Sequence, residues 1–214
     1  MEYARISKEE TRPIIVQKQE PYEYTVSYVP VETRKKIYFS NKELTHLTIA
    51  ALLVIGIGLS LGLFSDTSYM MLIAFATILT ASFLLHEIAH KIVAQREGLW
   101  AEFRLTLIGA ALTLISIITP LFKIISPGAI MIAGLADRKR AGKISIAGPA
   151  TNMALSTVFL TLAFIFPNIG ILALAAFFNA WMALFNLIPL GILDGFKIFT
   201  WDKKSWILAF SISL

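Results

Sequence analysis

YMMLIAFATILTASFLLHEIAHKIVA, residues 69–94, is the stretch of sequence that decides the fold. It is longer than the roughly 20 apolar residues that a helix needs to cross a bilayer. His86, Glu87 and His90 interrupt its second half. A charged side chain at the centre of a membrane helix costs roughly 2.5–3.5 kcal/mol, so Glu87 requires a polar partner or a cavity. The sequence therefore predicts a polar site embedded in the membrane.

The composition of the whole chain agrees with a membrane protein. Of the 214 residues, 57% are hydrophobic and 15% are charged, and the mean hydropathy is +0.71. Soluble domains are about 45–50% apolar and about 25% charged. The net charge of +5 comes from basic residues beside apolar runs, where Lys and Arg set the orientation in a bilayer. We therefore expect the lipid bilayer as a partner, and no nucleic acid.

Three further apolar runs, 44–64, 144–166 and 169–189, have the length of membrane-spanning helices. The run 105–118 is too short to span comfortably, and prolines and glycines follow it up to residue 135. Irregular backbone is tolerated at membrane depth only where protein or a wet cavity satisfies its polar groups. The sequence thus predicts an all-α polytopic membrane protein. It would have about four core transmembrane helices and a re-entrant or partly stranded insertion between the second and third.

Charge and composition divide the chain into a polar cytosolic N-terminal arm (1–43), a membrane-embedded core (44–200) and a short C-terminal tail (201–214). The arm carries β-branched stretches between prolines, which favour an extended, partly stranded structure. We expect no cleavable signal peptide, because the first apolar run lies too deep in the chain. Eight Lys or Arg residues precede residue 44, and none lies in the turns 65–67 and 167–168. Because cytosolic loops are enriched in Lys and Arg, we expect a multi-pass protein with a cytosolic N-terminus and both turns facing outward.

The spacing of the two histidines suits a metal ion. Residues four apart lie on one face of a helix, one turn from each other, so the imidazoles of His86 and His90 can reach the same ion. The adjacent Glu87 can approach a metal-bound water without becoming a ligand, which suits a general base. Zinc would lower the pKa of that water to about 7 and polarise a carbonyl. HExxH also arises by accident in many proteins, and it is the membrane helix around it that favours a metal site.

A third ligand is found by elimination. The chain has no cysteine, so the remaining ligand of a zinc site must be a carboxylate. Asp194 has apolar neighbours, lies at the depth of the cytosolic side, and is flanked by Gly191 and Gly195, which let the backbone bend close to a metal. Its alternative role is that of a helix cap. The other acids considered adjoin basic residues or lie in the outward turn: Asp66, Glu97, Glu102, Asp137 and Asp202.

The motif HEIAH (86–90), together with Asn186-Leu187-Ile188-Pro189 and Leu193-Asp194-Gly195, resembles the site-2 protease family of intramembrane zinc metalloproteases. Gly148-Pro149 with Asn152 is similar to the Gly-Pro-x-x-Asn element on the third core helix of that family. The likeness covers roughly residues 44–200.

This resemblance implies one zinc ion per chain, bound by His86, His90 and Asp194, with Glu87 as the catalytic base. It implies hydrolysis of a peptide bond in or near a transmembrane helix of a protein substrate, as in regulated intramembrane proteolysis. It also implies that Asn186 acts in catalysis by steadying the developing oxyanion or the peptide; the alternative for Asn186 is a polar residue that ends a helix before Pro189.

Two other functions fit parts of the pattern. A membrane zinc carrier or sensor would use the same ligands without hydrolysis, but transport favours polar groups at several depths, and the outer halves of the apolar runs carry few. A structural scaffold leaves Glu87 and Asp194 unexplained. His46, a lone histidine near the start of an apolar run, is expected to have a packing or interfacial role.

Overall fold

The computed structural model describes residues 11–15, 26–30, 37–63, 68–119, 123–134, 136–191 and 193–214. The chain forms two compact units, 1–36 and 37–214. In the first, strands β1 (Thr11–Ile15) and β2 (Val26–Pro30) pair in antiparallel register, with Thr11 opposite Pro30. These strands confirm the partly stranded structure expected from the β-branched stretches. The turn predicted at 65–67 lies outside the described residues.

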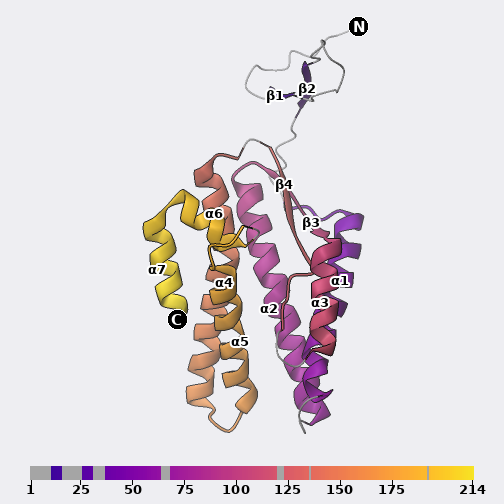
Figure 1. Ribbon diagram of the computed structural model, residues 1–214, viewed down its shortest axis with the longest axis vertical. Helices are drawn as coiled ribbons and strands as arrows, with labels where there is room; N and C mark the ends of the chain where they lie inside the picture. The colour runs from indigo at the N-terminus through magenta and orange to yellow at the C-terminus, as the bar shows by residue number, and fades with distance from the viewer. Residues whose placement is uncertain are drawn as a thin grey trace. The chain divides into compact units, whose positions relative to one another are not determined.

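Helices dominate the second unit, and Figure 1 shows its long helices with roughly aligned axes. Among the residues that the structure describes, three helices are long and apolar enough to cross a membrane: α1 (Asn41–Ser60), α2 (Tyr69–Arg96) and α4 (Arg138–Ile165). Helix α5 (Gly170–Asn186) has 17 residues and is about 25 Å long, somewhat shorter than a hydrocarbon core of about 30 Å. Three of the four predicted crossings thus have spanning length, and the fourth stays a prediction.

Side-chain caps decide where the long helices begin. Ser40 accepts a hydrogen bond from the backbone N–H of Glu43, so α1 starts before the apolar run does. Asp137 accepts from the backbone N–H of Arg140 in the same way, so α4 starts at the basic cluster rather than at Ile144. Both helices therefore extend beyond their apolar cores at the end that carries basic residues.

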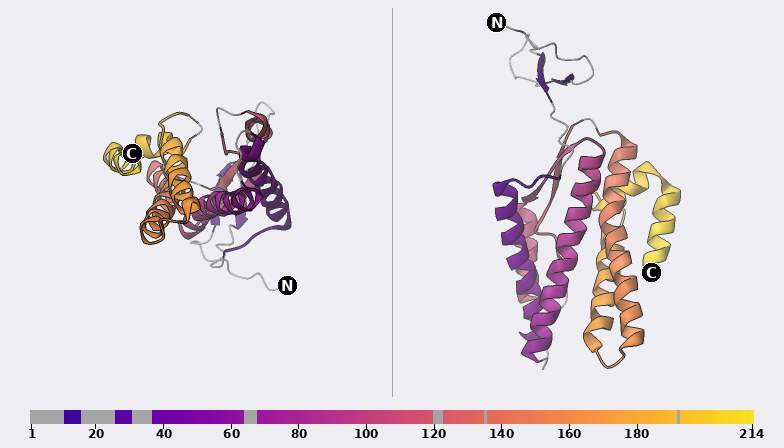
Figure 2. Two further views of the ribbon diagram at one scale, coloured as in Figure 1. Left: turned by 90° about the horizontal axis from the view of Figure 1, so that it is seen from below. Right: turned by 180° about the vertical axis from the view of Figure 1, so that it is seen from behind.

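The predicted insertion is a two-stranded hairpin with a helix between its strands. β3 (Trp100–Leu105) pairs antiparallel with β4 (Gly128–Ala133), and α3 (Leu107–Ile118) lies between them in sequence. Helix α3 packs on α1 at one edge of the bundle, as the views in Figure 2 show. The stranded part of the prediction is confirmed. Its first strand begins at Trp100, earlier than expected.

An apolar core joins the first two helices to the hairpin. The largest cluster of buried side chains comes from α1, α2, β3 and α5: Leu47, Ala50, Val54, Ile57, Phe75, Leu79, Phe83, Phe103 and Met182. A Cβ added at Gly58 would lie 2.5 Å from the Cα of Ala76, so α1 and α2 approach each other closely. The second half of α2 packs against α4.

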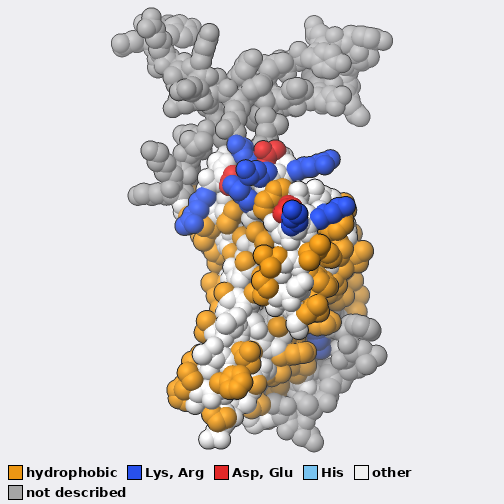
Figure 3. All heavy atoms as spheres, turned by 90° about the vertical axis from the view of Figure 1, so that its left-hand side faces the viewer, with side chains coloured by type: hydrophobic (Ala, Val, Ile, Leu, Met, Phe, Trp, Pro, Cys, Tyr) orange, Lys and Arg blue, Asp and Glu red, His pale blue; other side chains and the backbone are white. Residues whose placement is uncertain are grey.

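Two short helices complete the unit beside α4: α6 (Asp194–Trp201) and α7 (Lys203–Ser213). The predicted C-terminal tail is therefore helical over most of its length. Asp202 caps α7 by accepting from the backbone N–H groups of Lys204 and Ser205. Figure 3 shows this face, where most Lys and Arg side chains gather at one end and apolar side chains cover much of the rest. Large apolar side chains are strongly exposed, as at Phe164, which suits a lipid environment.

Candidate metal centre

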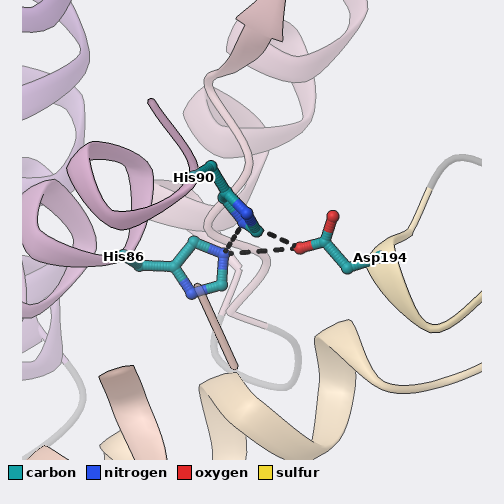
Figure 4. Close-up of side chains that lie close together, drawn as sticks. All are labelled: His86, His90 and Asp194. Carbon is teal, nitrogen blue, oxygen red and sulfur yellow. Dashed lines mark hydrogen bonds and ion pairs between the residues drawn. The ribbon is translucent and has the colours of Figure 1, made fainter. Parts of the chain in front are cut away.

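The polar site joins the second half of α2 to the first residue of α6. His86 and His90 project from α2 one turn apart, and Asp194 points at them from the opposite side (Figure 4). The Nε2 atoms of the two histidines are 3.1 Å apart, and the Oδ2 atom of Asp194 lies 3.0 Å from His90 Nε2 and 3.6 Å from His86 Nε2. In tetrahedral zinc sites, bond lengths of about 2.0–2.1 Å place ligand atoms about 3.3 Å apart. The three atoms therefore have the spacing of zinc ligands.

The segment before Asp194 is fixed by a hydrogen bond from α7 and by a close backbone contact at Gly195. The indole N–H of Trp206 donates to the backbone carbonyl of Leu187, 2.8 Å away, and so joins α7 to the segment after α5. The same carbonyl lies against Gly195, where an added Cβ would come within 2.1 Å of it. Only glycine fits there, and Asp194 in turn begins α6, where the helix dipole favours a negative charge. The sequence pattern Asp-Gly thus has a steric reason.

Hydrogen bonds at the far side of each imidazole direct both Nε2 atoms into the centre. The Nδ1 atom of His90 lies 2.7 Å from the carbonyl oxygen of Ile144, which can only accept, so Nδ1 carries a hydrogen, and in the neutral ring Nε2 carries a lone pair. The Nδ1 atom of His86 lies 2.5 Å from the Oδ1 atom of Asn152 and donates to it in the same way. With both rings neutral, two lone pairs and a carboxylate oxygen then meet with no hydrogen between them. This arrangement repels itself unless a cation binds, so the donor set fits zinc.

Helix α4 leaves room for the cluster at one glycine. A Cβ added at Gly148 would come within 2.3 Å of His90 Nε2 and 2.5 Å of His86 Nε2. The element Gly148-Pro149 with Asn152, singled out in the sequence, therefore does two things. Its glycine admits the Nε2 atoms, and its asparagine binds one of the rings from behind.

Comparison with known proteins connects this geometry to a family. The chain is 32% identical over 177 residues to a protein of Methanocaldococcus jannaschii named "Putative zinc metalloprotease MJ0611", a match that covers 79% of this chain and 90% of that protein. The chain belongs to the site-2 protease family. A protein of Mycobacterium tuberculosis named "Putative zinc metalloprotease Rip3" is 34% identical over 131 residues, which are 58% of this chain and 29% of that protein. No protein-family model and no solved structure gives a significant match.

Glu87 stands apart from the three ligand atoms in this member of the site-2 protease family. Its side chain is buried, and electrostatic interactions link it to His86, Asp194 and Lys197. It is not one of the three residues whose ligand atoms converge, and within the described part of the chain no residue donates a hydrogen bond to it. The carboxylate is therefore available to take a proton.

Asn186, which the resemblance assigns to catalysis, is the last residue of α5. Its amide donates to the carbonyl of Met182 in its own helix, 2.9 Å away, and its side chain lines a small cleft with Lys123 and Phe185. Within the described part of the chain, no hydrogen bond joins its side chain to His86, His90 or Asp194. Its catalytic role stays a prediction.

The other acids considered in the sequence have partners of their own. Glu97 pairs with Lys143, and Glu102 pairs with Arg104. Asp137 and Asp202 cap α4 and α7, and Asp66 lies outside the described residues. His46 accepts a hydrogen bond from the backbone N–H of Leu105 at the end of β3, which is the packing role expected for it.

Sequence reasoning missed a buried ion pair and a buried amide. Lys91, next to His90, forms a buried ion pair with Glu43 of α1, and Glu43 also accepts from the backbone N–H of Phe103. The signal was present, because a lysine within an apolar run needs a partner. Asn179 of α5 is also buried, and it contacts Asn152.

Proposed function

We propose that this protein hydrolyses a peptide bond in or near a transmembrane helix of a protein substrate, using one zinc ion per chain. One observation carries the proposal: three convergent ligand atoms on helices of a largely apolar bundle, with the carboxylate of Glu87 beside them and not among the ligands. The names of the relatives support the metalloprotease part.

The chemistry follows from the residues present. His86, His90 and Asp194 would hold zinc, which when bound supplies a Lewis acid that polarises the scissile carbonyl and makes water more acidic. Glu87 takes a proton from the attacking water as its oxygen bonds to the carbonyl carbon, and delivers a proton to the leaving nitrogen as the C–N bond breaks. Asn186 is proposed to hydrogen-bond the substrate peptide or the developing oxyanion with the second hydrogen of its amide, while the first is donated to the carbonyl of Met182.

The setting of the site favours a substrate within the bilayer. His86 and His90 lie in an apolar helix of spanning length, and α4, which covers them, is another. A substrate helix has its backbone N–H and C=O groups bonded internally, so it must unwind locally before a carbonyl can reach the site. Helix-breaking residues in the substrate should therefore promote cleavage.

The distribution of basic residues supports a site toward the cytosolic side. Basic residues lie in the first turns of α4 and in α6 and α7, at Arg138, Lys139, Arg140, Lys143, Lys197, Lys203 and Lys204. Figure 3 shows most Lys and Arg side chains of this face gathered at one end. The end of α2 that bears the site also carries Arg96. Because such residues are enriched in cytosolic loops, this end of the bundle and the N-terminus are assigned to the cytosol.

The test is Glu87→Gln in the full chain, with cleavage of a model transmembrane substrate and bound zinc measured together. Cleavage should fall by at least about a hundredfold, the size of a lost general base, while zinc stays near one per chain. Glu97→Gln is the matched control, since it makes the same change in a surface acid that pairs with Lys143. Retained cleavage in Glu87→Gln would refute the role of Glu87. Zinc flux into vesicles by the parent protein without any proteolysis would favour a carrier instead.

A further inference from the structure

Three buried polar side chains outside the proposed ligand set form a row across the bundle. Ser82 on α2, Asn152 on α4 and Asn179 on α5 are each at most 2% exposed. A buried polar group costs free energy unless it is hydrogen-bonded, and each of these three is. Asn152 is hydrogen-bonded to His86, and in the described part of the chain the hydrogen bonds of Asn179 and Ser82 lead to the centre through Asn152.

The donor and acceptor roles along this row of hydrogen bonds are fixed at one end by a backbone carbonyl. The Nδ2 atom of Asn179 lies 2.9 Å from the carbonyl oxygen of Ala175 and 3.0 Å from the Oγ atom of Ser82. A carbonyl only accepts, so the amino group of Asn179 must face Ala175, and its Oδ1 atom must face away. Because the carbonyl cannot become a donor, the side-chain amide of Asn179 has only one orientation that satisfies this hydrogen bond.

The orientation of Asn179 in turn fixes the amide orientation of Asn152 and the position of the hydrogen on His86. The Oδ1 atom of Asn179 lies 3.0 Å from Asn152 and only accepts, so the nearby atom of Asn152 must be its amino Nδ2. The Oδ1 atom of Asn152 then faces the Nδ1 atom of His86, 2.5 Å away, and this nitrogen must carry the hydrogen. In the neutral ring, the Nε2 atom of His86 then has a lone pair, which a metal ligand requires.

We propose that Asn179 is a positioning residue for the metal centre: acting through Asn152, it holds His86 in the tautomer whose Nε2 atom can bind zinc. The inference rests on the proposal that His86, His90 and Asp194 hold the ion. Without Asn179, the amide of Asn152 is free to turn and offer its amino group to Nδ1. His86 would then carry its hydrogen on Nε2, in the place where zinc binds.

The two histidines differ in how their tautomers are set. His90 donates to the carbonyl of Ile144, which is fixed by the backbone of α4. His86 depends on a side-chain amide, which has two orientations and is held in one of them by Asn179. A change at residue 179 should therefore alter His86 and leave His90 unchanged.

The experiment compares Asn179→Leu with Ser156→Ala in the full chain, purified in detergent. Ser156 donates to the carbonyl of Ala176, so its loss removes another hydrogen bond between α4 and α5 that does not lead to His86. Zinc affinity by competition with a chelator should fall about tenfold to a hundredfold in Asn179→Leu, as for other residues that orient a ligand. In Ser156→Ala it should change less than about twofold.

Two further readouts separate positioning from packing. In the zinc-free protein, ¹⁵N spectra of labelled histidine should show His86 protonated at Nδ1 in the parent and partly at Nε2 in Asn179→Leu, with His90 unchanged. Adding Asn152→Asp to Asn179→Leu should restore affinity to within about threefold of the parent, because both oxygens of a carboxylate accept and its orientation no longer matters. A purely structural defect would not be rescued in this way.

Each outcome decides the matter. An unaltered His86 tautomer in Asn179→Leu, or an equal loss of zinc in both single variants, overturns the proposal. If Asn179→Leu does not fold, the smaller Asn179→Ala carries the same expectations. Failure of the parent to bind zinc would overturn the proposed function, whereas the tautomers of the zinc-free protein would still test the role of Asn179.

Discussion

Gly148 lies directly against His90 across the α2–α4 interface, where a Cβ on residue 148 would approach His90 Nε2 to within 2.3 Å. The contact joins the two halves of the bundle at the point where ligand atoms converge. It makes the metal centre sensitive to a single methyl group on α4.

Gly148→Ala should therefore weaken zinc binding by about tenfold to a hundredfold, because the imidazoles must turn away from the common centre. Zinc affinity can be measured by chelator competition in detergent. Gly170→Ala is the matched control, since a Cβ there meets nothing within 4 Å. If both variants bind zinc like the parent, the cluster does not have the geometry described.

The buried ion pair between Lys91 and Glu43 should matter for stability. Lys91→Met leaves the carboxylate of Glu43 buried without its cation and should lower the free energy of unfolding by about 3–5 kcal/mol. The double variant Glu43→Gln/Lys91→Met should be more stable than Lys91→Met alone, because a neutral amide can still accept from Phe103. Thermal unfolding in detergent measures both. A double variant no more stable than the single one would contradict this account, and Lys139→Met is the exposed control.

Trp206 should support the segment that carries Asp194. Trp206→Phe keeps an aromatic ring but removes the hydrogen bond to the carbonyl of Leu187, worth about 0.5–1.5 kcal/mol. If this free energy is lost from the zinc-binding conformation, zinc affinity falls by about twofold to tenfold. Trp100→Phe, at the start of β3, makes the same change away from this segment and should leave the affinity as it is. Equal effects of the two changes would show that α7 does not hold the site.

The proposed topology can be read with single cysteines, because the natural chain has none. Lys139→Cys lies at the start of α4 and Asn168→Cys in the turn after its end. In cells or oriented vesicles, an impermeant thiol reagent should label the first only from the cytosolic side and the second only from the opposite side. Labelling of both from one side would rule out the crossing by α4. The parent chain, without a thiol, is the blank.

The sequence by itself determined the long apolar helices and the two histidines on one of them. These follow from local rules: a run of apolar residues has no alternative to a helix in lipid, and a spacing of four places two side chains on one face. Elimination among the acids also brought forward Asp194, because the other acids have basic neighbours or lie at the wrong depth.

Only the tertiary structure decided the position of Asp194 beside the histidines, and the route from Asn179 through Asn152 to His86. These contacts join residues far apart in the chain, so no periodicity records them. The pairing of β3 with β4 across α3 was likewise decided by register between distant segments. A hydrogen bond between two asparagines leaves no pattern in a sequence, because its partner is chosen by how helices pack and not by spacing.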